Sequence, residues 1–407
     1  MLAPVRPSIV AAGATHVGNV RDHNEDAHLV AADDGIFIVC DGMGGHAAGE
    51  VASALGVRVT REHWLGAAVQ RAASAWATTG TLEARRAFLS AVKAGVMAAH
   101  RTICEQADAD DGKHGMGTTF TGVVVAGGDA VVAHAGDSRA YLVRGGIAVQ
   151  LTEDHTLLAR LLASGMPMAE GTNSARWKGV ITNALGFGDD TKVITFLVPL
   201  SDGDKLLLCS DGISEYIGEA EVGQVLVAQP SPARAAQRLV ELALERGGED
   251  NATALVIKVV EVGQAPVAAA QRQLDDDALA RCPLYEPLSP QQRLRAARIA
   301  VSRDFSAGDL IPEASMGSRV AWVVLGGEIV LGGATRGPST LLYPEALLGQ
   351  GSPRRADALA VAIDDVRALA IRGDDFLELA GEDPDLAEPM YAALAQMIGG
   401  APKKATP

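Results

Sequence analysis

Four aspartates lie where runs of apolar residues that favour β-strands begin or end. They are Asp41, Asp137, Asp211 and Asp250. If these strand ends meet at one rim, four carboxylates converge, and such a cluster cannot stay ionised without cations. Because the ligands offered are oxygens only, the sequence predicts Mg²⁺ or Mn²⁺. Two such ions activate a water molecule and support an in-line displacement at phosphorus.

The segment of residues 15–26 gathers an arginine, acids and amides between apolar stretches. The planar, permanently charged guanidinium of Arg21 suits a phosphate group. Glu25 and Asp26 point to opposite sides if the chain is extended there, so at most one of them faces a site directly. Taken alone, the segment favours a charged surface loop. The phosphate-binding interpretation of Arg21 depends on the four aspartates.

The elements that must position these residues are helices and antiparallel strands. Apolar residues at helical spacing predict helices at residues 49–55, 82–107, 155–164 and 231–245. Short apolar runs predict strands at residues 36–40, 119–126, 130–135, 140–144, 147–151, 204–209 and 254–260. Glycine-rich junctions at 127–128 and 145–146 indicate hairpins within one meander, and Asp137 lies inside it. This pattern indicates an α+β fold.

Composition excludes several classes of function. The chain has 407 residues, 48% of them hydrophobic, with 35 basic and 50 acidic residues and a net charge of −15. This balance argues against nucleic acid or an anionic membrane as the main partner. The four cysteines show no CxxC or zinc spacing, which fits a reducing compartment. No stretch approaches about 20 uninterrupted apolar residues. We therefore expect a soluble, cytoplasmic protein.

A second domain is expected after the strand that ends near residue 260. We predict a first domain at residues 1–262, a linker at 263–274 and a second domain at 275–400. Helices are expected at residues 279–288, 290–300 and 386–398. Residues 321–325 with 328–331, and 359–363 with 366–371, are expected to form hairpins. A small β-roll between helices is the architecture that this order favours.

The ordered motifs of the first domain resemble those of the metal-dependent protein serine/threonine phosphatases of type 2C, in their bacterial form. The motifs are RDHNED, DGMGGH, GMGTTF, GDSRA, LTEDH, SDG and EDNAT, spread in family order over roughly residues 8–260. The resemblance implies two packed antiparallel sheets flanked by helices, an αββα β-sandwich. It also implies hydrolysis of phosphoserine or phosphothreonine in proteins by a metal-activated water, without a covalent intermediate.

The resemblance also implies metal ligands. Asp41 would bridge two ions, and the carbonyl of Gly42 would bind one of them. Asp211 and Asp250 would complete the second ion, while Glu25 and Asp26 would act through water. A third ion would lie at Asp137 and Asp211.

Substrate contacts follow from the same resemblance. Arg21 would bind the phosphate, and Asn251 and Thr118 belong to the substrate-binding motifs. Some family members carry a histidine after the Asp-Gly pair that is thought to protonate the leaving group, but here the residue is Met43. His46 stands three residues further on, and it is either the alternative proton donor or a residue that hydrogen-bonds within the turn.

The second domain resembles a cyclic-nucleotide-binding domain of the catabolite-activator type. The similar stretches are residues 282–285, 306–309 and 325–328. In that family a glutamate binds the ribose and an arginine nine residues later binds the cyclic phosphate, which corresponds to Glu345 and Arg354. Pro344 and Asp357 depart from the family pattern. The alternative is a degenerate domain that docks a protein or dimerises.

These observations predict a metal-dependent phosphatase whose C-terminal domain regulates it. The expected partners are a phosphorylated protein and, at the second domain, a cyclic nucleotide or a docking protein. The competing hypothesis is a sensor without catalysis, in which the first domain only binds a phosphoprotein. The complete set of metal-binding acids favours the enzyme.

Overall fold

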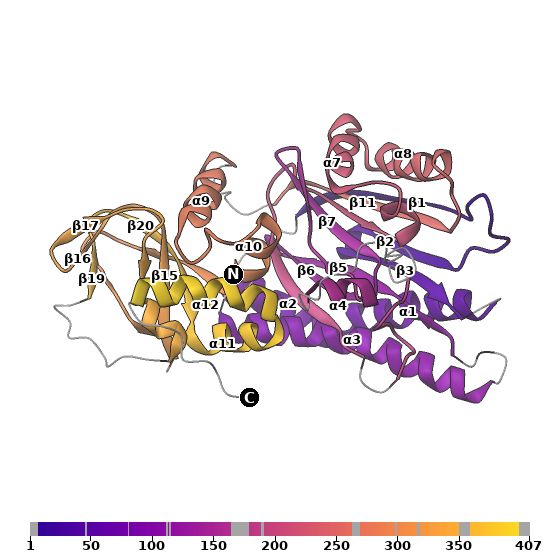
Figure 1. Cartoon of the computed structure of the whole chain (residues 1–407), viewed down its shortest axis with the longest axis horizontal. Coiled ribbons are helices and arrows are strands. Elements are labelled where there is room, and N and C mark those ends of the chain that lie inside the picture. The colour runs from indigo at the N-terminus through magenta and orange to yellow at the C-terminus, as the bar shows by residue number, and fades with distance from the viewer. Residues whose placement is uncertain are drawn as a thin grey trace. The chain divides into compact units, whose positions relative to one another are not determined.

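The computed structural model describes residues 7–44, 47–79, 81–110, 113, 115–163, 179–188, 191–262, 269–297, 299–315, 318–349 and 359–398. The chain divides into two compact units, Met1–Pro266 and Val267–Pro407 (Figure 1). Each unit has its own strands, helices and clusters of buried apolar residues. No helix among the described residues has the length and apolar character needed to cross a membrane.

Two antiparallel sheets form the centre of the first unit. One sheet has the strand order β1–β11–β10–β7–β8, with bounds Ser8–His16, Ala252–Glu261, Lys205–Cys209, Arg139–Arg144 and Ile147–Gln150. The other has the order β2–β3–β5–β6–β9, with bounds Asp26–Ala31, Ile36–Met43, Phe120–Ala126, Asp129–Ala135 and Ile194–Pro199, and β4 (Gly117–Thr118) pairs with β3. Strands β1 and β11 contact β2, and β10 contacts β3, so the two sheets face each other.

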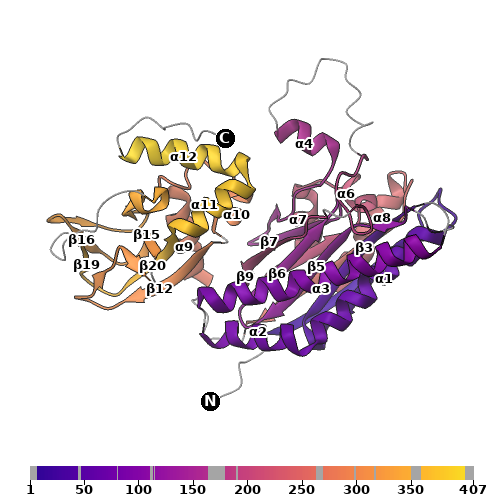
Figure 2. The same cartoon turned by 90° about the horizontal axis from the view of Figure 1, so that it is seen from below.

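Helices cover the outer faces of these sheets (Figures 1 and 2). Helices α1 (Ala47–Leu65), α2 (Ala67–Thr79) and α3 (Leu82–Ala109) lie on the β3 sheet, whereas α7 (Glu219–Ala228) and α8 (Pro232–Glu245) lie on the β11 sheet. Burying the apolar stripe of each helix on a sheet stabilises both. Trp64 illustrates this packing, because it meets Phe120 edge-on with ring centroids 5.8 Å apart. The mixed fold of antiparallel strands and helices is confirmed.

The meander expected around Asp137 divides between the two sheets. Strands β5 and β6 form one hairpin and β7 and β8 form another, as expected. The two hairpins do not pair with each other, however, because β6 lies in one sheet and β7 in the other. Residues 136–138 therefore cross between the sheets. Gly136 has a φ of 115°, a conformation that residues with a side chain rarely adopt.

The second unit has two further sheets with helices at both ends of its sequence. Its helices are α9 (Ala269–Arg281), α10 (Pro290–Ala297), η3 (Pro344–Leu348), α11 (Gly373–Glu382) and α12 (Pro384–Ile398). One sheet has the order β12–β20–β15–β14, with bounds Ala300–Phe305, Val366–Arg372, Ser318–Gly326 and Ala314–Ser315, and β18 (Leu341–Leu342) pairs with β15. The other has the order β13–β19–β16–β17, with bounds Leu310–Ile311, Ala360–Ala362, Ile329–Leu331 and Ala334–Arg336.

Three sequence-based expectations for this unit are wrong in detail. Strand β15 pairs with β20 and not with β16, and β19 pairs with β16 and β13 and not with β20, so neither expected hairpin forms. At the turn between β15 and β16, and again between β19 and β20, the chain passes from one sheet of the unit to the other. Helix α9 begins at Ala269 and ends at Arg281, whereas the helix was expected at residues 279–288. The helix expected at 386–398 is present as α12.

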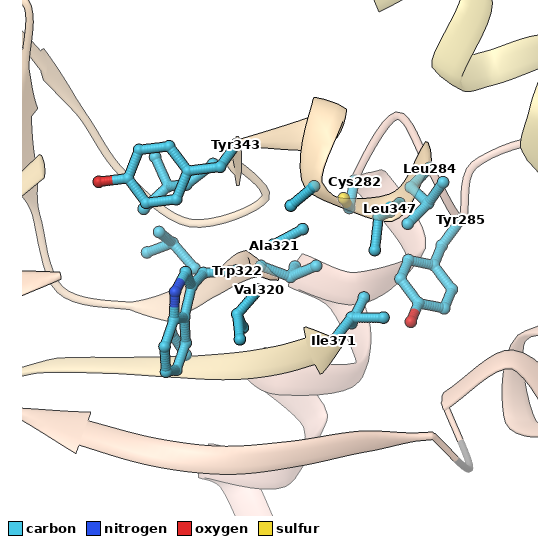
Figure 3. Packing of buried hydrophobic residues seen from close by; sticks show 14 of the residues in the cluster. Cys282, Leu284, Tyr285, Val320, Ala321, Trp322, Tyr343, Leu347 and Ile371 are labelled. Atoms are coloured by element: carbon cyan, nitrogen blue, oxygen red, sulfur yellow. The ribbon is translucent and has the colours of Figure 1, made fainter. Parts of the chain in front are cut away.

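A continuous apolar core holds the two sheets of the second unit together (Figure 3). Trp322 is 2% exposed, and its indole nitrogen donates a hydrogen bond to the carbonyl of Pro312 at 2.6 Å. The hydroxyl of Tyr343 donates to the carbonyl of Ile311 at 2.9 Å and accepts from the amide of Ala360 at 2.7 Å. This buried hydroxyl therefore bridges Ile311 and Ala360, which stand opposite each other on the neighbouring strands β13 and β19.

Candidate active site

The end of β3 positions Asp41. Residues 36–40 are fully buried, which fixes this strand between its neighbours, and Asp41 stands directly opposite Asp26 of β2. Side chains of directly opposed residues lie on the same face of an antiparallel pair. The Thr118 hydroxyl donates to the carbonyl of Asp41 at 2.9 Å, and the amide of Asp41 donates to the Thr119 hydroxyl at 2.9 Å. The backbone of Asp41 is therefore fixed on both sides.

Thr118 itself has no exposed surface. It was expected to bind substrate, but the structure buries it beside β3, where its hydroxyl donates to two backbone carbonyls. In this structure it positions Asp41.

Two glycines let helix α1 approach β3 closely. A Cβ atom on Gly42 would lie 2.1 Å from the carbonyl oxygen of Gly49 and 2.7 Å from that of Glu25. A Cβ atom on Gly49 would lie 2.7 Å from the carboxyl carbon of Glu25. Only glycine fits at these contacts. The close approach packs Glu25 against these two glycines at the edge of the cleft, which Glu25 lines and Asp26 does not.

Asp211 and Asp250 come from the other sheet. Strand β10 ends at Cys209, and Asp211 begins the short helix α6 (Asp211–Ser214). A Cβ atom on Gly212 would lie 2.0 Å from the carbonyl oxygen of Asn251, so this glycine brings α6 against the start of β11. The contact places Asp211 and Asp250 at the same end of the sheet.

Asn251 connects this end of β11 to the loop before β2. Its amide nitrogen donates to the carbonyls of Val17 and His23, at 2.8 and 2.9 Å, and its amide oxygen accepts from the backbone amide of Glu25 at 2.7 Å. It is 5% exposed, and all the groups of its side chain are used within the protein. Asn251 was expected to bind substrate, but in this structure it shapes the loop that carries Arg21.

Arg21 lies at the mouth of the site. One of its terminal nitrogens lies 2.6 Å from a carboxylate oxygen of Asp250, and the two side chains are 52% and 35% exposed. An ion pair this exposed contributes little to stability. It does hold beside the aspartates a guanidinium whose other donors form no hydrogen bond with the described residues, which is the arrangement that binding a phosphoryl group needs.

These residues line one cleft of about 300 Å³. Its lining comprises Arg21, Glu25, Asp41, Gly42, Met43, Gly44, Ile181, Asp211 and Asp250. Asp137 is buried and Asp26 is half-buried, and neither is among the residues that line the cleft. Ile181 and Gly44 were not expected from the sequence. Ile181 reaches the cleft because it forms a β-bridge with Thr156, a long-range pairing that no local spacing signals. His46 lies outside the described residues.

Burial and mutual repulsion make the carboxylates of this site hard to ionise. Burial, with the nearby charges of Asp26, Asp211 and others, raises the pKa of Asp41 well above its usual range. Burial also raises the pKa values of Asp26 and Asp137 to about 7 and that of Asp211 to about 6, where the charge of Asp250 adds to the effect. Divalent cations are the natural counter-charge for such a cluster.

Unsatisfied oxygen atoms at the site fit such cations. One oxygen each of Asp26, Asp137 and Asp211 is buried and has no hydrogen-bond partner among the described residues. Carboxylate oxygens without donors suit hard cations such as Mg²⁺ and Mn²⁺. As the side chains stand, no three His, Cys, Asp or Glu in the described ranges form a complete ligand set. The individual ligand assignments therefore stay predictions.

The second expected site lies in the C-terminal unit. Glu345 is in η3, directly after Tyr343 and Pro344, and Tyr343 has a φ of 55°. Arg354 and Asp357 lie outside the described residues, so the structure does not test whether Glu345 and Arg354 come together.

Comparisons with known proteins support the same chemistry as the residues of the cleft. The family model described as Protein phosphatase 2C matches residues 12–245. The serine/threonine phosphatase stp of Listeria innocua is 34% identical over 247 residues, which is 60% of this chain and 93% of that protein. The serine/threonine protein phosphatase PstP of Mycobacterium tuberculosis is 36% identical over 265 residues, which is 64% of this chain and 48% of that protein.

A solved structure points to the same class of protein. The catalytic domain of PstP in complex with 2 manganese ions is 34% identical, with a TM-score of 0.51, and the match covers 62% of this chain and 99% of that one. Manganese in this relative agrees with the predicted Mn²⁺ or Mg²⁺ cofactor. The matched family region contains Arg21, Glu25, Asp41 and Asp211 of the cleft. The chain therefore belongs to the protein phosphatase 2C family, as a metal-dependent protein serine/threonine phosphatase of bacterial type.

Proposed function

We propose that the cleft hydrolyses phosphoserine and phosphothreonine in proteins with the help of two or three Mn²⁺ or Mg²⁺ ions. One observation supports this most strongly. Four separate segments of the chain, which carry Arg21 with Glu25, Asp41, Asp211 and Asp250, line a single cleft. A cation-binding cluster beside a guanidinium is the combination that hydrolysis of a phosphate ester needs.

The metal ions would be held mainly by carboxylates. Asp41, the carbonyl of Gly42, Asp211 and Asp250 would bind two ions, with Glu25 and Asp26 acting through water. Asp137, with Asp211, would hold a third. When bound, such ions lower the pKa of a water molecule and neutralise charge on the phosphoryl group.

The side chains of the protein supply the rest of the mechanism. Arg21 binds the phosphoryl oxygens and orients the ester, while Asp250 holds the guanidinium in place. Met43 and Ile181 are the large apolar side chains of the lining and would contact the substrate chain. The described lining contains no serine or cysteine, in keeping with direct attack by water and no covalent intermediate. Met43 has no proton to donate to the leaving group.

We further infer that the facing sheets and outer helices of the first unit form the αββα sandwich of this family, and that the second unit is a regulatory β-roll. The antiparallel sheets of the second unit and the helices at both of its ends support this inference. Its ligand would be a cyclic nucleotide held by Glu345 and Arg354, or a docking protein. The reaction would take place in the cytoplasm.

Release of phosphate from a phosphothreonine peptide tests this function. We expect activity with Mn²⁺ or Mg²⁺, none with EDTA, and little on a matched phosphotyrosine peptide. Cyclic AMP or cyclic GMP should change the rate if the second unit binds a nucleotide, and an unchanged rate would favour protein docking. If the full chain binds the peptide but never releases phosphate with either metal, the sensor hypothesis takes the place of the enzyme.

A further inference from the structure

Asp26 is held beneath the cleft by hydroxyl groups of the opposite sheet. It belongs to β2, whereas its hydrogen-bond partners precede α6 and lie on β11. The hydroxyls of Ser210 and Thr253 both donate to the same carboxylate oxygen, Oδ2, at 2.8 and 2.6 Å. The other oxygen, Oδ1, is buried and receives no hydrogen bond from the described residues. The two oxygens therefore have different surroundings.

The hydrogen bonds that link Asp26, Asn24, Thr15 and Thr253 all point the same way, with each residue donating to the next. Because Thr253 gives its hydroxyl proton to Asp26, its oxygen must accept in the 2.7 Å contact with the hydroxyl of Thr15. Thr15 accepts in turn from the amide nitrogen of Asn24 at 2.9 Å, and the amide oxygen of Asn24 accepts from the backbone amide of Asp26 at 3.1 Å. Hydrogen bonds that point the same way reinforce one another.

Backbone pairing fixes the members of this chain. Thr15 and Thr253 stand opposite each other in the β1–β11 ladder. The amide of Thr253 donates to the Ser210 hydroxyl at 3.0 Å, and the amide of Ser210 donates to the carbonyl of Thr253 at 3.1 Å. Ser210 and Thr253 are fully buried. The hydroxyls are thus set by the rigid sheet and have little freedom to turn away from Asp26.

The position of Asp26 Oδ1 indicates what the hydrogen bonds to Oδ2 do. Asp26 stands opposite Asp41, and its charge is felt by Asp41 as strongly as that of any neighbouring group. With Oδ2 occupied, Oδ1 is the oxygen left to interact with the cation site that Asp41 and Asp211 line. Groups that lie behind the direct ligands of a metal, as Asp26 would in acting through water, commonly change metal affinity by about 10- to 100-fold.

We propose that Thr253, Ser210 and Thr15 are positioning residues, which fix Asp26 so that its Oδ1 faces the metal centre and thereby raise the affinity for Mn²⁺. This inference rests on the proposed function, because it assigns these residues to the same cation site. The three residues act through Asp26 and touch neither substrate nor metal.

Calorimetric titration of the full chain with Mn²⁺ tests the proposal. Thr253→Val keeps the branched shape and removes the hydroxyl, and we expect it to weaken Mn²⁺ binding by at least about 10-fold. Thr253→Ser restores the hydroxyl and should bind Mn²⁺ within about 2-fold of the wild type. In the reaction, Thr253→Val should require more Mn²⁺ for half-maximal rate while the KM for phosphopeptide at saturating Mn²⁺ stays near that of the wild type.

Thr60→Val is a matched control. Thr60 on α1 has no exposed surface, and its hydroxyl has no partner among the described residues. The same substitution there should leave Mn²⁺ affinity unchanged. Ser210→Ala, which removes the second hydroxyl, provides an independent variant if Thr253→Val does not fold.

The outcomes separate this inference from the function on which it rests. A wild type that binds no Mn²⁺ would overturn the metal site itself. A wild type that binds Mn²⁺, together with folded Thr253→Val and Ser210→Ala variants of equal affinity, would overturn only the positioning role. Equal loss of affinity in Thr253→Ser and Thr253→Val would also overturn it, because the hydroxyl would then not be the cause.

Discussion

Arg21 is the residue whose role is most separable from folding. Its only ion pair among the described residues is with Asp250, and half of its side chain is exposed. An exposed pair of this kind contributes about 0–1 kcal/mol to stability. Its guanidinium is therefore available to a phosphoryl group at little cost to the fold.

Replacing Arg21 by alanine should therefore weaken substrate binding more than it weakens the protein. We expect kcat/KM for a phosphothreonine peptide to fall by about 100-fold, mainly through KM, because a charge-assisted contact is lost. Arg21→Lys should recover only part of this, since an ammonium group cannot form the paired contact. Steady-state kinetics and thermal unfolding of the three proteins provide the check. An unchanged KM in Arg21→Ala would contradict the phosphate-binding role.

Most of the charged residues that line the cleft could be predicted from the sequence, but the roles of the residues that hold them in place could not. Asp41, Asp211 and Asp250 stand at strand ends, a local signal that spacing reveals. Thr118 and Asn251 have the polar side chains of binding residues, yet both are buried and bond to backbone groups. Whether a polar side chain faces a cleft or the interior depends on contacts with distant segments, which residue type does not show.

Close contacts between elements bring the two halves of the site together. Helix α6 touches the start of β11 at Gly212, and this contact places Asp211 near Asp250. The clash of an added Cβ atom would be with backbone, which cannot rotate away.

Gly212→Ala should separate these elements. We expect a loss of about 1–3 kcal/mol in unfolding free energy from overpacking, together with weaker Mn²⁺ binding. Gly218→Ala is the matched control, because Gly218 has a φ of −76° and an added Cβ atom there meets no atom within 4 Å. Chemical unfolding and Mn²⁺ titration of both variants give the measurement. Equal behaviour of the two variants would show that the contact at Gly212 does not matter.

The strands of the second unit could be located from the sequence, but their pairing could not. Apolar alternation and glycine pairs located β15, β16, β19 and β20 closely. Their partners were mispredicted, because a tight turn is compatible with a hairpin and also with a strand that crosses to a second sheet. Long-range packing around residues such as Trp322 and Tyr343 decides between the two, and neither periodicity nor turn composition records it.

At the scale of the whole molecule, each unit carries its own apolar core, and the first contains a buried pair of histidines. The rings of His134 and His155 lie 4.9 Å apart. One ring nitrogen of His134 hydrogen-bonds the carbonyl of Glu153 at 2.9 Å, which connects β6 to the segment before helix α4 (Leu157–Ala163). Burial lowers the pKa of His134 to about 4, and burial with the neighbouring ring lowers that of His155 to about 3.

These low pKa values predict how stability depends on pH. In the unfolded chain a histidine binds a proton near pH 6.5, whereas the folded protein resists protonation of His134 down to about pH 4. The contribution of His134 to stability is therefore present above pH 6.5 and is lost as the pH falls towards 4. Each pH unit in this window costs about 1.4 kcal/mol per histidine.

His134→Gln should remove one histidine from this dependence. We expect the variant to be less stable than the wild type at pH 7.5, with a difference that shrinks as the pH falls from 6.5 to about 4. The raised pKa values of the site aspartates change stability with pH in the opposite direction. Because both proteins carry these aspartates, this contribution cancels when the two are compared in EDTA. Urea unfolding at several pH values supplies the data, and a difference that does not change with pH would refute the buried neutral histidine.

If the cleft formed by the two facing sheets is a metal-dependent phosphatase site, its activity must depend on the charge of Asp211. Asp211→Asn removes this charge, which the metal needs, and keeps the shape of the side chain. Asp304→Asn, at an exposed position on β12 of the second unit, is the control. We predict that Mn²⁺-dependent phosphate release falls by at least about 100-fold in Asp211→Asn, with weaker Mn²⁺ binding, and is unchanged in Asp304→Asn. Full activity and full Mn²⁺ affinity in Asp211→Asn would contradict the claim.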